Sequence, residues 1–184
     1  MKPVYYTVAS TAFGAAGVVW MQKDGSPTVM KICFPVEGEG TDNLVRRYFP
    51  GAEIRSHSNV EKVCHYLREY LAGDPPEFSL NMLDMRACSQ FQRNVLILVW
   101  SIPRGMVGTY KGLAGKIRAP KGARAVGMAL ASNPFPLVIP CHRVIRTDGS
   151  LGGYGGGVEM KQNLLEIEGV LVNEKGKVLP RFFW

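Results

Sequence analysis

The chain has 184 residues, of which 46% are hydrophobic and 20% charged, a composition typical of a folded protein rather than a disordered one. Its 22 Lys and Arg residues outnumber 15 Asp and Glu, so the net charge is +7, which favours a polyanionic partner such as nucleic acid or anionic lipid. No apolar run reaches the roughly 18 residues of a membrane span, and residues 1–7 lack the apolar core of a signal peptide. We therefore expect a cytoplasmic protein or, depending on the host, a nuclear or nucleoid-associated one.

The first part of the chain predicts a small α+β domain over residues 1–85. Short segments rich in Val, Tyr and Ile, separated by glycine and proline, predict strands over 4–9, 17–22 and 28–34. Apolar residues at helical spacing then predict helices over 41–48 and 59–71, the second of which is stopped by Gly73.

Residues 86–184 are mostly helical in pattern and predict a second domain. Ser89 is placed to cap a helix over 91–100, and Thr109 to cap a short helix over 110–116. Pro120 opens a further helix that ends before Asn133. Residues 111–116 and 121–131 therefore form a candidate helix-turn-helix, although helix pairs of this kind also occur in proteins that do not bind DNA.

The second helix of this pair begins with unusually small residues. Gly122, Ala123 and Gly127 leave its surface smooth, and Arg124 is the long cation that rises from it. Small residues let a helix backbone approach whatever it faces. The partner can be DNA or another helix, with Arg124 solvated in the second case.

Residues 133–144 read Asn-Pro-Phe-Pro-Leu-Val-Ile-Pro-Cys-His-Arg-Val, and their prolines exclude a helix. The apolar run places Cys141 at the edge of a core, and the adjacent His142 can activate a thiol. Neighbouring side chains in an extended chain point apart, so contact between these two needs a turn or a bridging water. A structural cysteine and a catalytic nucleophile both remain open.

A glycine-rich stretch over residues 149–157 follows, and its spacing is not that of a phosphate-binding loop. It predicts either a mobile linker or a loop that wraps a flat ligand, with Tyr154 as a stacking face. Residues 161–168 then predict a helix that stops at Gly169. At its end, Glu168 can either orient His142 or be solvated.

The four cysteines form no C-x-x-C pair, so we expect free thiols and no metal site. An alternative is a metal site in which Cys33, Cys64 and His65 meet in space.

Together these segments resemble the O6-alkylguanine-DNA alkyltransferases, also called the methylated-DNA–protein-cysteine methyltransferase family. The resemblance covers residues 91–169 and centres on Pro-Cys-His-Arg-Val at 140–144. The other matching elements are Phe91-Gln92, Ile102-Pro103-x-Gly105, Tyr110, Leu113-Ala114, Arg124-Ala125-Val126-Gly127, Asn133-Pro134, Gly152-Gly153-Tyr154 and Glu168-Gly169. The sequence departs from the family at Leu96, where Trp is common, and at Thr109, where Ser is usual.

The resemblance implies a role for each residue of the reactive site. Cys141 is the alkyl acceptor, His142 acts as base through a water, and Glu168 orients the imidazole, leaving the thiol more thiolate-like. Asn133 braces the turn that leads to the reactive segment. Tyr110 crowds a phosphate to rotate the nucleotide out, and donates a hydrogen bond to guanine N3.

The resemblance also implies a DNA interface and a base pocket. Arg124 enters through the minor groove and fills the vacated stack, while Gly122, Ala123 and Gly127 let their helix lie in that groove. The residues implied for the pocket are Val144, Tyr154 and Gly155, with Lys161 at its rim.

The implied function is DNA repair by direct damage reversal. Duplex DNA containing O6-alkylguanine is the partner, the damaged base is flipped out, and a monomer transfers the alkyl group irreversibly to its own cysteine without a cofactor. Whether O4-alkylthymine also reacts stays open, and the first domain is implied to be ribonuclease-H-like. The alternatives are a damage-recognition protein that does not react, a hydrolase using Cys141, His142 and Glu168, and a DNA-binding regulator.

Overall fold

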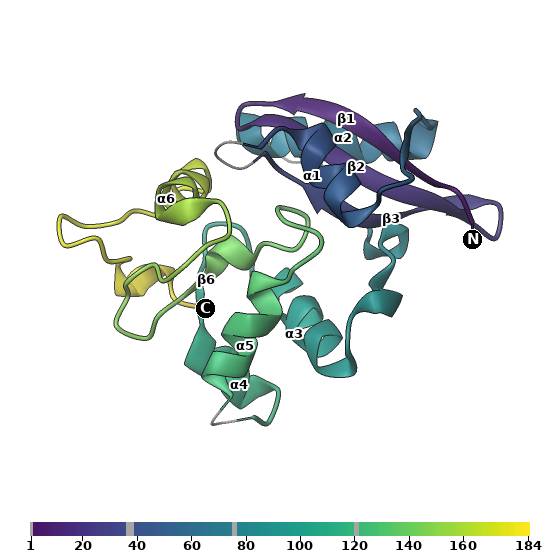
Figure 1. Cartoon of the computed structure of the whole chain (residues 1–184). Helices are drawn as coiled ribbons and strands as arrows, with labels where there is room; N and C mark the ends of the chain where they lie inside the picture. The colour runs from purple at the N-terminus through teal and green to yellow at the C-terminus, as the bar shows by residue number, and fades with distance from the viewer. Residues whose placement is uncertain (1, 36–38, 75–76, 120–121) are drawn as a thin grey trace. The chain divides into compact units, whose positions relative to one another are not determined.

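A computed structural model describes residues 2–35, 39–74, 77–119 and 122–184 (Figure 1). The chain divides into two compact units, Met1–Ala87 with Pro134–Pro136, and Cys88–Asn133 with Leu137–Trp184. The mixed α+β architecture is confirmed, with the sheet early in the chain and mostly helices later. Pro134–Pro136 group with the first unit, although the sequence assigned them to the second domain; the amide of Ile32 donates to the carbonyl of Pro134.

The first unit is built on a sheet with the strand order β3-β2-β1-β4. Strands β1 (Val4–Thr11), β2 (Gly14–Lys23) and β3 (Ser26–Cys33) are antiparallel neighbours, and each contains most or all of a predicted strand. The short β4 (Glu53–Ile54) pairs parallel to β1 and was not predicted, because two residues carry too little periodicity to identify.

Helices α1 (Thr41–Tyr48) and α2 (Ser58–Ala72) pack on this sheet, and both were predicted (Figure 1). Tyr6 and Val19 form a buried cluster with Leu44 and Val45 of α1. Helix α1 comes so close to β2 that a Cβ on Gly17 would lie 2.8 Å from the Val45 side chain. A glycine on β2 therefore permits this packing.

In the second unit, α3 (Gln90–Trp100), α4 (Tyr110–Lys116) and α5 (Ala123–Ala131) pack against one another. Both predicted caps are confirmed, since Ser89 accepts from the amide of Gln92 and Thr109 from that of Gly112. The predicted opening of the third of these helices, at Pro120 and Lys121, lies outside the described residues.

The rest of the second unit contains two short strands, a 3-10 turn and a helix. Strand β5 (Gly108–Thr109) pairs parallel to β6 (Val144–Ile145), which directly follows the 3-10 turn η3 (Cys141–Arg143). Helix α6 (Gly157–Ile167) starts four residues before the predicted position. Of the remaining 3-10 turns, η1 (Leu80–Met82) and η2 (Met85–Ala87) belong to the first unit and η4 (Pro180–Phe182) to the second. Among the described residues, every helix is too short or too polar to cross a bilayer.

Candidate functional site

The turn η3 presents three buried side chains in succession. Cys141 is 8% exposed, His142 is fully buried and Arg143 is 8% exposed. The amide of Cys141 donates to Ile139 and that of Arg143 to Pro140, so the chain bends sharply after the proline. The chain is therefore turned, not extended, at Cys141 and His142.

Asn133 connects the end of α5 to this turn. Its side-chain amide donates to the carbonyl of Ile139 over 3.0 Å. The same side chain hydrogen-bonds with Cys141 and lowers the pKa of the thiol. The structure thus places Asn133 where the sequence expected a brace, and adds a direct contact with the sulfur.

His142 and Glu168 form a buried pair, with 2.8 Å between Nε2 and Oε1. Burial raises the pKa of Glu168 to about 8, but the two bonds from the Arg143 guanidinium favour its charged form. A carboxylate can only accept, so the proton between the pair sits on Nε2, and Nδ1 is the basic nitrogen of this tautomer. Burial lowers the pKa of His142 well below its usual value, and the charges of Arg143, Lys161 and Arg104 lower it further. His142 is therefore a neutral imidazole, the form that can accept a proton.

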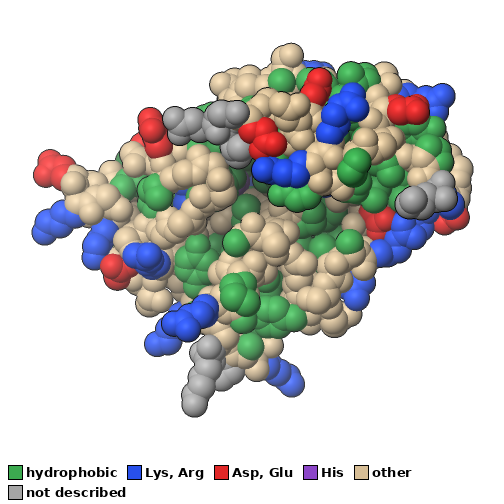
Figure 2. Space-filling view, viewed as in Figure 1, with side chains coloured by type: hydrophobic (Ala, Val, Ile, Leu, Met, Phe, Trp, Pro, Cys, Tyr) green, Lys and Arg blue, Asp and Glu red, His purple; other side chains and the backbone are tan. Residues whose placement is uncertain are grey.

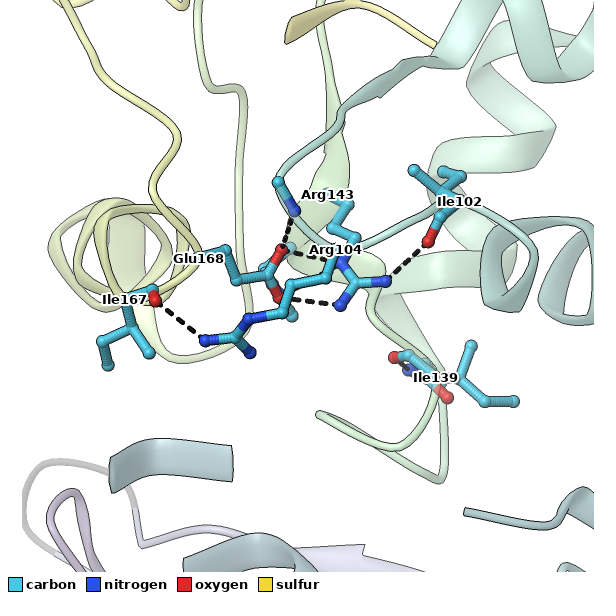
Figure 3. A network of polar contacts seen from close by, with 9 residues as sticks. Ile102, Arg104, Ile139, Arg143, Ile167 and Glu168 are labelled. Atoms are coloured by element: carbon cyan, nitrogen blue, oxygen red, sulfur yellow. Dashed lines mark hydrogen bonds and ion pairs between the residues drawn. The ribbon is translucent and has the colours of Figure 1, made fainter. Parts of the chain in front are cut away.

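Arg143 binds both oxygens of the same carboxylate (Figure 3). Its Nε lies 2.8 Å from Oε2 and its Nη2 lies 2.9 Å from Oε1 of Glu168, while Nη1 donates to the carbonyl of Ile102 over 2.6 Å. Nearby, Arg104 donates to the carbonyl of Ile167. The sequence analysis named Arg143 only as part of the Pro-Cys-His-Arg-Val motif and gave it no role. Its position inside the apolar run 137–145 was a signal, because a buried arginine needs a buried partner.

Cys141 itself is a protonated thiol in this environment. Burial raises its pKa, and the side chain of Asn133 and the charge of Lys161 only partly oppose that effect. The expectation that the resting cysteine is more thiolate-like is therefore wrong for the site as it stands. Tyr154 also hydrogen-bonds with Cys141, and burial raises the pKa of this phenol well above its usual value, so it stays a hydroxyl.

Lys161 lies in the interior, which corrects its expected place at a pocket rim. The side chain is fully buried, and Nζ donates to the carbonyls of Val144 over 2.6 Å, Leu151 over 2.5 Å and Gly153 over 3.5 Å. Burial lowers the pKa of Lys161 to about 8. Its ammonium ties α6 to β6 and to the glycine-rich stretch, a role that sequence could not reveal because its partners are backbone carbonyls.

Tyr110, the first residue of α4, lies between α5 and the glycine-rich stretch. A Cβ on Gly152 would lie 3.3 Å from its ring, and one on Gly127 would lie 3.8 Å from it. Burial raises the pKa of Tyr110, so the phenol keeps the proton that a donor needs. At Gly155, by contrast, an added Cβ would meet nothing within 4 Å, and the residue is exposed.

The outer surface around α4 and α5 is basic and partly apolar. Arg124 is exposed at the start of α5, with Gly122 as N-cap and Ala123 half-buried, and Met128 is 66% exposed. Figure 2 shows apolar side chains at the surface over this part of the second unit, with Lys and Arg side chains around them. A hollow of about 630 Å³ beside α4 is lined by Thr109, Lys111, Gly112, Gly115, Lys116 and Thr147.

The described residues contain no group of three or more His, Cys, Asp and Glu side chains that could hold a metal ion. Cys33 and Cys64, considered above with His65, are buried free thiols, whereas the His65 side chain is 59% exposed.

The fold and the site define a two-unit α+β protein with a buried Cys-His-Glu array, and the chain matches proteins of one family. A family model described as the DNA-binding domain of 6-O-methylguanine DNA methyltransferase matches residues 90–170. A methylated-DNA–protein-cysteine methyltransferase of Methanothermobacter thermautotrophicus is 50% identical over 111 residues, which are 60% of this chain and only 62% of that relative. One from Shigella flexneri is 41% identical over 126 residues, covering 66% of this chain and 71% of the relative.

Solved structures agree with these matches. The crystal structure of Mycobacterium tuberculosis OGT in complex with DNA superposes with a TM-score of 0.72 at 31% identity, covering 89% of this chain and 92% of that one. The chain belongs to the methylated-DNA–protein-cysteine methyltransferase family.

Proposed function

We propose that the protein repairs DNA by transferring the alkyl group of O6-alkylguanine to Cys141. The observation that carries this proposal is the buried array in which Glu168 holds a neutral His142 beside the cysteine. A thiol nucleophile, a base and a third group that orients the base are the components of covalent catalysis by a cysteine. Family membership supplies the substrate class.

The transfer proceeds by displacement at the alkyl carbon. His142 takes the thiol proton at Nδ1 through a water, and Sγ attacks the carbon as its bond to O6 breaks. The bonding electron pair leaves with O6, and the phenol of Tyr110 stabilises the departing guanine by donating a hydrogen bond to N3. The proton passes from His142 to the base or to solvent, so the products are guanine and S-alkylcysteine.

Because a thioether is a stable product, each molecule reacts once, and no external cofactor takes part. Asn133 supports the nucleophile through its contact with Cys141, whose pKa it lowers. The resting cysteine is a neutral thiol and becomes a thiolate only as the reaction begins.

The substrate base reaches the site by rotating out of the duplex, since O6 is inaccessible inside the stack. We propose that α4 and α5 form a helix-turn-helix and that Arg124 fills the vacated space from the minor groove. The small residues Gly122, Ala123 and Gly127 support close approach to DNA. The lysines of the hollow beside α4 suit contacts with phosphates.

The flipped base occupies a pocket formed by Val144, Tyr154 and Gly155, with the buried Lys161 holding the backbone that lines it. The open space at Gly155 supports the approach of a flat ligand. The first unit takes a ribonuclease-H-like fold, and the protein acts as a monomer in the compartment that holds the DNA.

The test is the intact mass of the protein after mixing with a duplex that carries one O6-methylguanine. A single gain of about 14 Da, mapped to Cys141, is expected because one methyl group replaces one proton. Tight binding without any mass gain would instead support a damage-recognition protein that does not react, and turnover of small esters would support a hydrolase.

A second test separates Arg124 from the chemical step. Arg124→Ala should slow repair of a methylated duplex by at least about tenfold while leaving reaction with free O6-benzylguanine within about twofold, because only the duplex substrate needs the base rotated out. Lys175→Ala, which removes an exposed cation elsewhere in the second unit, controls for net charge. Equal losses on both substrates would contradict the assigned role.

A further inference from the structure

Arg143 has no part in the transfer described above, yet it bonds both Glu168 and the carbonyl of Ile102 (Figure 3). Two of its nitrogens bind the two oxygens of Glu168, and the third binds the carbonyl of Ile102. The Glu168 side chain is fully buried and that of Arg143 is 9% exposed. Bidentate guanidinium–carboxylate pairs of this kind fix both position and orientation.

The buried Glu168 carboxylate favours the doubly protonated, charged form of His142. A buried carboxylate beside an imidazole normally attracts a proton onto the ring, and a doubly protonated ring cannot act as a base. The charged groups that face His142 are Glu168, Arg143 on the same turn, Lys161 on α6 and Arg104 on the segment after α3. Arg143 is paired directly with the carboxylate, with 2.8 Å between Nε and Oε2.

We infer that Arg143 is a positioning residue that neutralises and clamps Glu168, so that the carboxylate orients His142 without protonating it. The bond to Ile102 prevents the guanidinium from turning away, and the paired bonds prevent the carboxylate from rotating. Glu168 then offers Oε1 to the Nε2 proton, which leaves Nδ1 as the basic nitrogen. The inference concerns the protonation of His142, and only its kinetic consequence rests on the proposed function.

The direct test follows the ring nitrogens of His142 by ¹⁵N NMR in the full-length protein. With three histidines in the chain, His57 and His65 serve as internal references. In the unmodified protein His142 should show no protonation across the neutral pH range, whereas in Arg143→Gln its titration midpoint should rise by at least about one pH unit. An unchanged titration in a folded Arg143→Gln protein would overturn the inference.

The kinetic test compares single-turnover rates with free O6-benzylguanine across pH. The ratio of the Arg143→Gln rate to the unmodified rate should fall by about tenfold for each pH unit below the midpoint at which His142 titrates in that variant. Above that midpoint it should return to within about twofold, as the extra proton is lost. Arg143→Lys, which keeps the charge but not the paired bonds, should show a lower rate with no such pH dependence. A loss of equal size at every pH would indicate a merely structural residue and overturn the inference.

The double variant Arg143→Gln/Glu168→Gln leaves neither charge of the pair buried without its partner. This variant should therefore fold even if Arg143→Gln does not. The amide introduced in place of the Glu168 carboxylate can still accept from Nε2, and His142 should again stay neutral. Titration of His142 in the double variant as high as in Arg143→Gln would contradict charge balance. If the unmodified protein transfers no alkyl group, the proposed function fails, but the NMR comparison still decides the role of Arg143.

Discussion

Two buried cysteines, one in each compact unit, show that burial alone does not make a reactive thiol. Cys33, at the end of β3, is 2% exposed in a cluster with Tyr6, Val19 and Val45, and burial raises its pKa to about 11. Cys141 is buried almost as deeply, and burial raises its pKa as well.

The difference between the two lies in polar neighbours. Cys141 has hydrogen bonds from Asn133 and Tyr154, a buried ammonium that favours its thiolate, and His142 next to it on the same turn. The apolar core around Cys33 offers no comparable base among the described residues of its cluster. A site that hides its sulfur from water therefore depends on internal groups to accept the proton and to stabilise the charge.

The largest expected effect comes from replacing Cys141 with alanine. Cys141→Ala should lose alkyl transfer by more than about 10³-fold while retaining binding to alkylated duplex, because the acceptor atom is gone. Cys33→Ala is the matched control and should react within about twofold of the unmodified protein. Mass spectrometry of the labelled peptides measures both, and any label remaining after Cys141→Ala would identify a different acceptor.

A smaller effect is expected from Asn133→Ala, which removes the hydrogen bond to the thiol and the one to the carbonyl of Ile139. The transfer rate to O6-benzylguanine at pH 7 should fall by about 10-fold to 100-fold, with partial recovery at higher pH, because the thiol pKa rises.

Gln92→Ala is a suitable control for that variant. Its amide bonds Ala129 and Ser132 at the same end of α5 without reaching the thiol. If both variants lose the same activity with the same pH profile, the effect comes from a loosened α5 rather than from the sulfur contact.

The smallest effect concerns stability at high pH. The folded-state pKa of Cys33 is raised above its unfolded value, so the folded protein retains a proton that the unfolded chain releases. The stabilisation is complete below about pH 9 and is lost towards pH 11, at most about 3 kcal/mol. Urea unfolding at pH 8 and pH 10.5 should show a smaller decrease for Cys33→Ala, and equal decreases would count against the raised pKa.

The sequence predicted the parts of this site that local chemistry encodes. Cys141 and His142 adjoin in one motif, Glu168 precedes a glycine stop, and Ser89 and Thr109 are caps whose partners lie three residues away. Each of these signals is short-range, so no knowledge of tertiary structure is needed to recognise it.

What the sequence missed depends on contacts between distant segments. The burial of Lys161 follows from carbonyls ten and seventeen residues away, and the pairing of Arg143 with Glu168 joins residues twenty-five apart. The early start of α6 at Gly157 was hidden because glycine disfavours helices.

The glycine-rich stretch near Tyr110 contains two unlike kinds of glycine. Gly152 has a φ of +73° and presses against the Tyr110 ring, so a side chain there faces both backbone strain and collision. Gly153 and Gly155 have neither restriction, since a Cβ at each would meet nothing within 4 Å. A segment of nearly uniform composition should thus show uneven mutational tolerance: in the absence of DNA a side chain at Gly152 should destabilise the fold, while one at Gly153 or Gly155 should not.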